Sequence, residues 1–94
     1  MTDKPVMEID EYGNKLWYLN GKVHREGGPA FESANGDKSW YLNGKLHRED
    51  GPAIEGSNGT KKWFLDDKLH REDGPAAVWN DGSQGWWLNG KQVT

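Results

Sequence analysis

Apolar residues along this chain come in short groups separated by polar turn dipeptides. Two such groups are "KSWYL" at 38–42 and "KLH" at 45–47, with Asn43-Gly44 between them. An Asn-Gly dipeptide between apolar groups is the strongest short-range signal of a β-hairpin. No window shows the 3.6-residue apolar spacing of a helix over a helical length. The pattern therefore predicts short antiparallel strands.

The pattern repeats with a fixed period. Trp17, Trp40, Trp63 and Trp86 lie 23 residues apart, and the units at 17–39 and 40–62 share 16 of 23 positions. A third unit occupies 63–85, a degenerate half-repeat occupies 6–16, and a second half-repeat occupies 86–94. We expect one domain over 1–94 in which the half-repeats cap a stack of identical joints.

Each unit holds two turn dipeptides and therefore two strands. If Asn43-Gly44 is a two-residue type I′ turn, Tyr41 lies opposite Leu46. If the second turn is equally short, Phe31 lies opposite Trp40, Ile54 opposite Trp63 and Ala77 opposite Trp86. We expect a break at Asp50-Gly51-Pro52, because proline donates no ladder hydrogen bond. The predicted fold class is all-β: a single-layer antiparallel meander of stacked β-hairpin repeats.

Both faces of such a sheet carry aromatic side chains. In this register one face bears the four periodic tryptophans beside His24, His47 and His70, and the other bears Tyr18, Tyr41, Phe64 and Trp87. A single layer cannot bury both of its faces. We therefore expect the sheet to curl, to be covered partly by its own side chains, or to offer one face to a partner.

Composition narrows the function classes. The 94 residues include no cysteine, which excludes disulfides and thiolate metal sites. A net charge of -3 with interspersed signs lacks the basic face of a nucleic-acid-binding protein. No apolar run approaches the ~20 residues of a membrane span, and "MTDKPVMEID" lacks the features of a signal peptide. We expect a soluble cytoplasmic chain without membrane insertion.

The repeat signature points to a family. The run aromatic-x-x-Asn-Gly-Lys-x-His, with a second Asn/Asp-Gly turn in every 23 residues, resembles MORN repeats from about Met7 to Val93. It is most similar to the variant found in bacterial and bacteriophage proteins, although "GPA" stands where that family has a small-residue and aromatic segment. The resemblance implies an elongated β-sheet that serves as a scaffold or interaction module, often in an oligomer. It implies no common catalytic residue, and it implies a bacterial cytoplasm, including that of a phage-infected cell.

The segment "LHREDGPA" occurs at 46–53 and 69–76, and "VHREGGPA" occurs at 23–30. Three histidines suggest a metal site or a catalytic base. Equivalent residues two strands apart are about 9.5 Å from each other, however, whereas metal ligands lie within ~2.1 Å of one ion. We favour a structural ladder in which His stacks on the cross-strand Trp, Arg pairs with Glu or Asp, and Pro packs on the next aromatic ring. Its members are Trp17, Trp40, Trp63, His24, His47, His70, Arg25, Arg48 and Arg71. We predict no catalytic residue, no metal ligand and no cofactor.

Positions that differ between the repeats are the candidates for a binding site. Asp66-Asp67 replaces one Asn-Gly turn, and "AAVWNDGSQGWW" gathers Val78, Trp79, Trp86 and Trp87 around one turn. Clustered tryptophans on an uncovered sheet are typical of a protein-binding hot spot. The alternatives are a hydrophobic cap or a homodimer seam for the tryptophans, and a merely tolerated turn for the aspartates.

These observations favour a non-enzymatic protein-protein interaction module that binds through a Trp-rich face or its C-terminal edge. A narrower form of this hypothesis is a phage-encoded inhibitor of a host bacterial defence complex. A carbohydrate-binding module that uses the Trp row is an alternative, because tryptophan rings stack on sugars. An enzyme or metal protein that uses one His cluster is a further alternative, and homo-oligomerisation is compatible with each of them.

Overall fold

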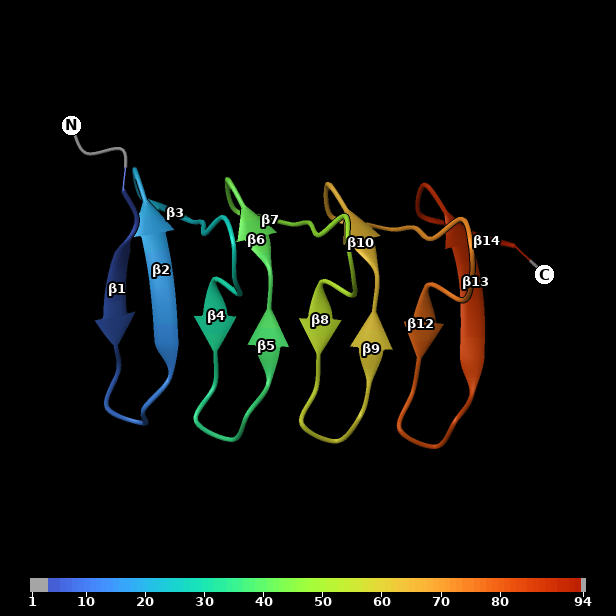
Figure 1. The fold of residues 1–94 in the computed structure, drawn as a ribbon, viewed down its shortest axis with the longest axis horizontal. Helices are drawn as coiled ribbons and strands as arrows, with labels where there is room; N and C mark the ends of the chain where they lie inside the picture. Colours follow the sequence, from blue (N-terminus) through green and yellow to red (C-terminus); the bar gives the residue numbers. More distant parts are fainter. Residues whose placement is uncertain (1–3, 94) are drawn as a thin grey trace.

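The computed structural model describes residues 4–93 (Figure 1). Residues 1–3 and Thr94, which belong to the expected domain 1–94, lie outside the described part. The strands are β1 (Val6–Ile9), β2 (Lys15–Leu19), β3 (Lys22–Val23), β4 (Phe31–Glu32), β5 (Lys38–Ser39), β6 (Tyr41–Leu42), β7 (Lys45–Leu46), β8 (Ile54–Glu55), β9 (Lys61–Lys62), β10 (Phe64–Leu65), β11 (Lys68–Leu69), β12 (Ala77–Val78), β13 (Gln84–Leu88) and β14 (Lys91–Val93). No helix of the described residues is long and apolar enough to cross a membrane.

The strands form one layer. The main sheet has the order β1-β2-β4-β5-β8-β9-β12-β13-β14, and β3 pairs with β2. The hairpins β6-β7 and β10-β11 form separate two-stranded sheets, because the strand is interrupted at Trp40 and Trp63. Figure 1 shows the hairpins side by side along the long axis of a body of 45 × 27 × 17 Å, with the chain ends at opposite sides. The all-β, single-layer antiparallel meander is confirmed.

The first turn of each repeat has the predicted register. Tyr41 pairs with Leu46, and Leu42 pairs with Lys45. Asn43 and Gly44 have φ values of 53° and 80°, as a type I′ turn requires. Asp66 and Asp67 keep this geometry with φ values of 50° and 67°.

The second turn differs from the prediction by one residue. Phe31 pairs with Ser39 rather than with Trp40. The loop spans three residues instead of two: the Ser33 N–H donates to the Asp37 carbonyl at 2.9 Å, and Gly36 has a φ of 100°. A glycine in the left-handed region is typical of three-residue hairpin loops.

The same shift occurs in the other repeats, where Ile54 pairs with Lys62 and Ala77 pairs with Gly85. Because alternate residues of a strand point to opposite faces, the shift changes which residues share a face. Phe31, Ile54 and Ala77 therefore lie on the face opposite the periodic tryptophans. We call the face that bears Trp17, Trp40, Trp63 and Trp86 the groove face, and the other the opposite face.

The expected break falls within the His-Arg-Glu segment. Strand β7 ends at Leu46 and β8 begins at Ile54, so the residues between them form a crossing loop. The loop ends at Ala53, which is 0% exposed, as are its counterparts Ala30 and Ala76. No large side chain of the described residues is fully buried. The core is therefore a narrow line of small side chains beneath half-buried aromatic rings.

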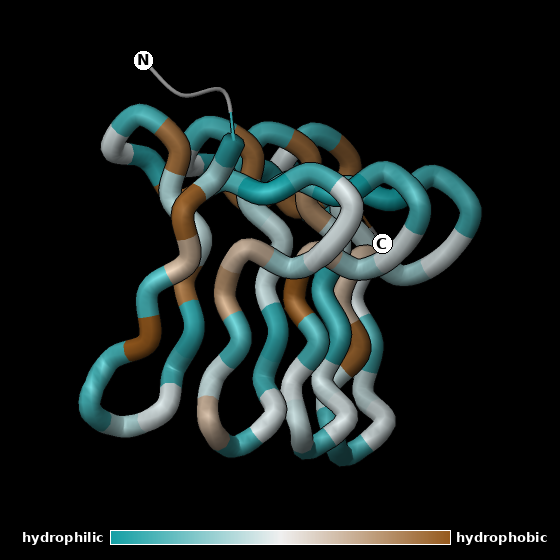
Figure 2. Tube along the Cα trace, turned by 60° about the vertical axis from the view of Figure 1, so that its left-hand side comes forward, coloured by the Kyte–Doolittle hydropathy of each residue, from teal (hydrophilic) through white to brown (hydrophobic). Residues whose placement is uncertain are grey.

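Neighbouring repeats are joined by hydrogen bonds at three heights. At the upper turn the Gly44 N–H donates to the Val23 carbonyl at 2.8 Å. In the middle β5 pairs with β8 of the next repeat, with Ser39 opposite Ile54. At the lower turn the Ser57 N–H donates to Asp37 Oδ1 at 2.7 Å. Figure 2 shows the resulting stack, with hydrophilic residues at the lower turns.

Candidate functional site

Each full repeat places an arginine over the ring of its own tryptophan. The Arg48 Cζ lies 3.9 Å from the centroid of the Trp40 ring. The same stacking, at 4.0 Å, joins Arg25 to Trp17 and Arg71 to Trp63. The structure gives this place to Arg rather than to the His predicted for it, because a planar guanidinium group stacks well on an aromatic face. One face of each of these three rings is covered, which leaves less room for a stacked sugar.

The remainder of the signature holds the arginine in place. Arg48 Nη1 donates to the Pro52 carbonyl at 3.0 Å and to the Glu55 carboxylate at 2.9 Å, and Nε donates to Asp50 at 3.2 Å. A Cβ on Gly51 would lie 2.9 Å from Arg48 Cζ, so only glycine fits there without displacing the guanidinium group. The predicted pairing of Arg with Glu and Asp is confirmed.

The repeats differ in these carboxylates. The first repeat has Gly27 where the second has Asp50, and the third has Val78 where the second has Glu55. Only Arg48 therefore has both acidic partners. Val78, a predicted binding residue, removes an ion pair from the third repeat and adds an apolar side chain to the groove face.

The histidines link each repeat to the next. The Asn43 N–H donates to His24 Nδ1 at 2.9 Å. The same bond joins Asp66 to His47 at 3.1 Å and Asn89 to His70 at 2.9 Å. Because Nδ1 accepts a hydrogen bond, the ring proton of the neutral histidine lies on Nε2. Nε2 faces a glutamate two residues along, at 3.2 Å for His47 and Glu49.

Both ring nitrogens thus have structural partners, which favours the ladder over a catalytic base. Among residues 4–93, no group of three His, Asp or Glu side chains is placed to hold a metal ion.

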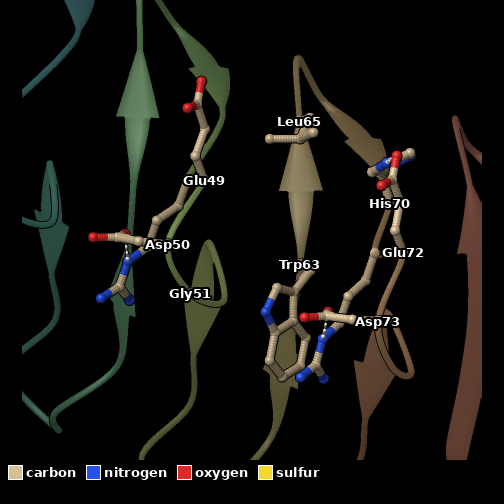
Figure 3. A pocket seen from close by; sticks show the side chains of 10 residues that line it. Glu49, Asp50, Gly51, Trp63, Leu65, His70, Glu72 and Asp73 are labelled. Carbon is tan, nitrogen blue, oxygen red and sulfur yellow. Dashed lines mark hydrogen bonds and ion pairs between the residues drawn. The ribbon is translucent and has the colours of Figure 1, made fainter.

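Three open grooves lie on the groove face: two between successive His-Arg-Glu loops, and one between the first of these loops and residues 4–5. The largest, of about 740 Å³, separates the loop at 48–51 from the loop at 70–73 (Figure 3). Its floor is formed by Trp63 and Leu65. Smaller grooves of about 420 Å³ and 390 Å³ lie over Trp17 and Leu19 and over Trp40 and Leu42.

These leucines are not among the binding residues predicted from the sequence. Their signal was present, because each stands two positions after a periodic tryptophan and therefore shares its face.

The C-terminal tryptophans do not form one cluster. Trp79 and Trp87 meet edge to face, with ring centroids 6.3 Å apart and planes at 65°. They lie on the opposite face, where the Trp87 ring occupies the space that a Cβ on Gly85 would need, 2.3 Å from the nearest ring atom. Trp86 lies on the groove face with Val78 and is 43% exposed. The four residues predicted to act together are thus divided between two faces.

Trp86 continues the groove floor. Trp86 and Leu88 occupy the places of Trp63 and Leu65 one repeat later, and they are 43% and 41% exposed. Val93, which pairs with Trp86, stands in the place of a histidine and is 40% exposed. The apolar floor is therefore most accessible in the last repeat.

The two aspartates of the third upper turn contact the preceding repeat. The Leu46 N–H donates to Asp67 Oδ1 at 2.7 Å, and Asp66 Oδ1 lies 3.5 Å from His47 Nδ1. These contacts place Asp66 and Asp67 beside β7 rather than beside the C-terminal tryptophans, so the predicted binding residues fall into separate places.

Two aspartates in lower turns, Asp10 and Asp81, have lowered pKa values. Hydrogen bonds from the Asn14 side chain and then its backbone N–H hold the pKa of Asp10 below its ordinary value of 3.8. Hydrogen bonds from the Ser83 hydroxyl and backbone N–H likewise lower the pKa of Asp81. Both carboxyls are fully exposed, so they anchor turns rather than mark a reactive site.

Comparisons with protein-family models, with curated proteins and with solved structures found no match to this chain.

Proposed function

We propose that this chain is a non-enzymatic protein-binding module whose groove face contacts the partner. The observation that carries the proposal is the row of three open grooves, each with a tryptophan and a leucine at its floor. The floor residues are half-buried, and accessible apolar surface with a polar rim is typical of interaction sites. The sequence resemblance to MORN repeats supports the same function class.

The polar residues of the signature support binding over catalysis. Each histidine and each arginine is engaged in holding its own repeat or the next one. A catalytic base needs a proton acceptor directed at a substrate, and here Nδ1 of each histidine is directed at a backbone N–H. The narrower hypothesis of an inhibitor of a host defence complex draws its support from the resemblance alone.

The test compares two matched double variants in capture from bacterial lysate with mass spectrometry. Trp86→Ala with Leu88→Ala removes two exposed side chains from the groove face, and both are at least 41% exposed in the folded chain. Val6→Ala with Tyr12→Ala removes two exposed apolar side chains elsewhere, with exposed fractions of 56% and 74%. Both variants are expected to stay folded, which circular dichroism verifies.

A near-stoichiometric partner that the wild type and the Val6/Tyr12 variant retain, and that the Trp86/Leu88 variant loses, is the expected result. Loss from the Val6/Tyr12 variant alone would move the site off the groove face. The absence of any captured protein under gentle and crosslinked conditions would contradict the proposal.

A further inference from the structure

The grooves differ in charge along the long axis. One carboxylate, that of Glu26, lines the first groove together with Lys4 and Arg25. Three carboxylates and two arginines line the second. The third has four carboxylates and two arginines: Glu49, Asp50, Glu72, Asp73, Arg48 and Arg71. The groove face thus becomes more acidic toward the C-terminal repeat, where its apolar floor is also most exposed.

These carboxylates remain open to a ligand. The side chains of Glu49 and Asp50 are 81% and 89% exposed, and those of Glu72 and Asp73 are 82% and 89% exposed. Each contacts one basic side chain of its own loop, for example Arg48, whose Nε lies 3.2 Å from Asp50. A carboxylate has about four acceptor positions. Figure 3 shows the two acidic loops on either side of the floor made by Trp63 and Leu65.

The third groove therefore combines acidic walls with a floor made by Leu65 and by Trp63, one face of which is covered by Arg71. Lysine and arginine side chains lay their alkyl stems along apolar surface while the charged head reaches polar groups. The side chain that complements this groove is therefore basic. It enters from solvent, lays its alkyl stem on Leu65 and places its charged head between the carboxylates. The stacked internal arginines show that the tryptophan rings already accept guanidinium groups.

The distance between neighbouring grooves matches one backbone conformation of a bound peptide better than another. One repeat advances two strands, or about 9.5 Å along the sheet. A polyproline II helix has three residues per turn and rises about 9.3 Å over them, so every third side chain points the same way. In a β-strand the side chains on one side recur about every 6.7 Å, which does not match.

We propose that the groove face binds an extended proline-rich segment of a partner protein that carries Lys or Arg at every third position. This inference rests on the proposed protein-binding function and names its partner class. Successive basic side chains occupy the second and third grooves, where carboxylates outnumber cations, and the third binds more strongly because it is the more acidic. Such segments lose little conformational entropy on binding, because their conformation is already extended before contact.

The experiment measures fluorescence anisotropy of two labelled peptides of identical composition with the full chain. In one, Arg-Pro-Pro is repeated four times. In the other, Arg-Pro-Arg-Pro-Pro-Pro is repeated twice, so arginines are two and four residues apart. We expect the three-residue peptide to bind at least about fivefold more tightly, since only it can place a cation in each of these two grooves.

A neutralised variant tests the place of binding. It combines Glu49→Gln, Asp50→Asn, Glu72→Gln and Asp73→Asn, which keep hydrogen-bond acceptors for His and Arg. Affinity for the periodic peptide is expected to fall at least about tenfold. The control variant, Glu8→Gln with Glu11→Gln, alters exposed acids outside the grooves and is expected to change affinity less than about twofold.

Equal affinity for the two peptides would overturn the match between the ligand and the repeat. Unchanged affinity in the neutralised variant would overturn the groove as its site. If neither peptide binds while the Trp86/Leu88 variant still loses its lysate partner, the basic proline-rich class is wrong and the protein-binding function stands. If no lysate partner is captured either, both proposals fall.

Discussion

At the scale of single residues, small side chains determine where the rings and guanidinium groups lie. Gly51 leaves space for Arg48 to stack on Trp40, and Ala53 is fully enclosed at the joint. The recurrence of Arg with Glu and Asp predicts that they pair. Cross-strand opposition predicts that His lies on the Trp ring, because it indicates neighbours but not which longer side chain folds back over them.

Gly85 is a direct test of this role. The Trp87 ring lies over it, whereas the first and second repeats have Ser39 and Lys62 in its place. Gly85→Ala is expected to destabilise the fold by about 1–3 kcal/mol, because the ring is forced off the strand. Urea unfolding measures the change.

The matched control combines Gly85→Ala with Trp87→Phe, which restores the smaller ring that the third repeat has at Phe64. A double-mutant cycle should then show a coupling above about 0.5 kcal/mol, since the two residues compete for one space. If the two substitutions change the free energy of unfolding additively, the proposed clash between a side chain at position 85 and the Trp87 ring is wrong.

His24 tests the link between repeats. Its side chain is 8% exposed, and Nδ1 accepts the Asn43 N–H. His24→Phe keeps a ring but removes the acceptor, so a loss of about 1–3 kcal/mol is expected from the unsatisfied N–H. Urea unfolding gives the stability, and amide exchange of Asn43 should accelerate.

The control is Glu26→Gln, which changes only the 84% exposed partner of His24 Nε2. Its effect should stay within about 0.5 kcal/mol, as for other surface substitutions. An equal loss in both variants would show that the glutamate contact, not the Nδ1 bond, is the important one.

At the scale of elements, the two kinds of turn were not equally predictable. Asn43-Gly44 specifies a two-residue type I′ turn, and the predicted register was confirmed. Asn35-Gly36 has the same letters, but it sits in a three-residue loop, in which Ser33 pairs with Asp37. The dipeptide alone does not reveal loop length, and a one-residue error reverses the face of every side chain that follows.

This error explains why the candidate site was only partly predicted. The periodic Trp positions, their Leu companions and the upper hairpins follow from period and alternation. Alternation already separates Trp86 from Trp87, but the side on which Trp79 lies depends on the lower-turn register, and the position of the Trp87 ring depends on the space above Gly85. The sequence shows neither directly.

The lower turn at Asp10 gives a prediction of pH dependence. Its folded-state pKa is below the ordinary 3.8, chiefly because the Asn14 side chain donates to the carboxylate. The stabilisation from this turn is therefore present above that ordinary value and is lost as the pH falls through the lower folded-state pKa.

An NMR titration of the Asp10 carboxyl measures the midpoint. Asn14→Ala should move the midpoint back toward 3.8, because it removes the largest cause of the shift. A midpoint that does not move would show that the backbone N–H bonds suffice.

At the scale of the whole molecule, stability is distributed over equivalent joints. Neighbouring repeats are joined by the same hydrogen bonds at the upper turns and by strand pairing in the main sheet, and residues 4–93 contain no fully buried large side chain around which a central core could form. In such arrays stability is approximately a sum of repeat and interface contributions.

Deletion of residues 40–62 tests this additivity. The deletion joins Ser39 to Trp63 and leaves every remaining joint in register, so the shortened chain should fold with a long axis about 9.5 Å shorter. Small-angle scattering measures the length, and urea unfolding should show a smaller m-value because less surface is exposed. Deletion of 40–59 breaks the register and should not fold. Failure of the in-register deletion would mean that the repeats are not interchangeable.

The direction of the joints has a mechanical consequence. Ladder hydrogen bonds lie perpendicular to antiparallel strands, and here that direction is the 45 Å axis between the two ends of the chain. Tension applied at the ends loads all joints equally, because they are in series, and the weakest joint opens first. The molecule is thus expected to unfold under force in steps of one repeat and to refold in the same steps.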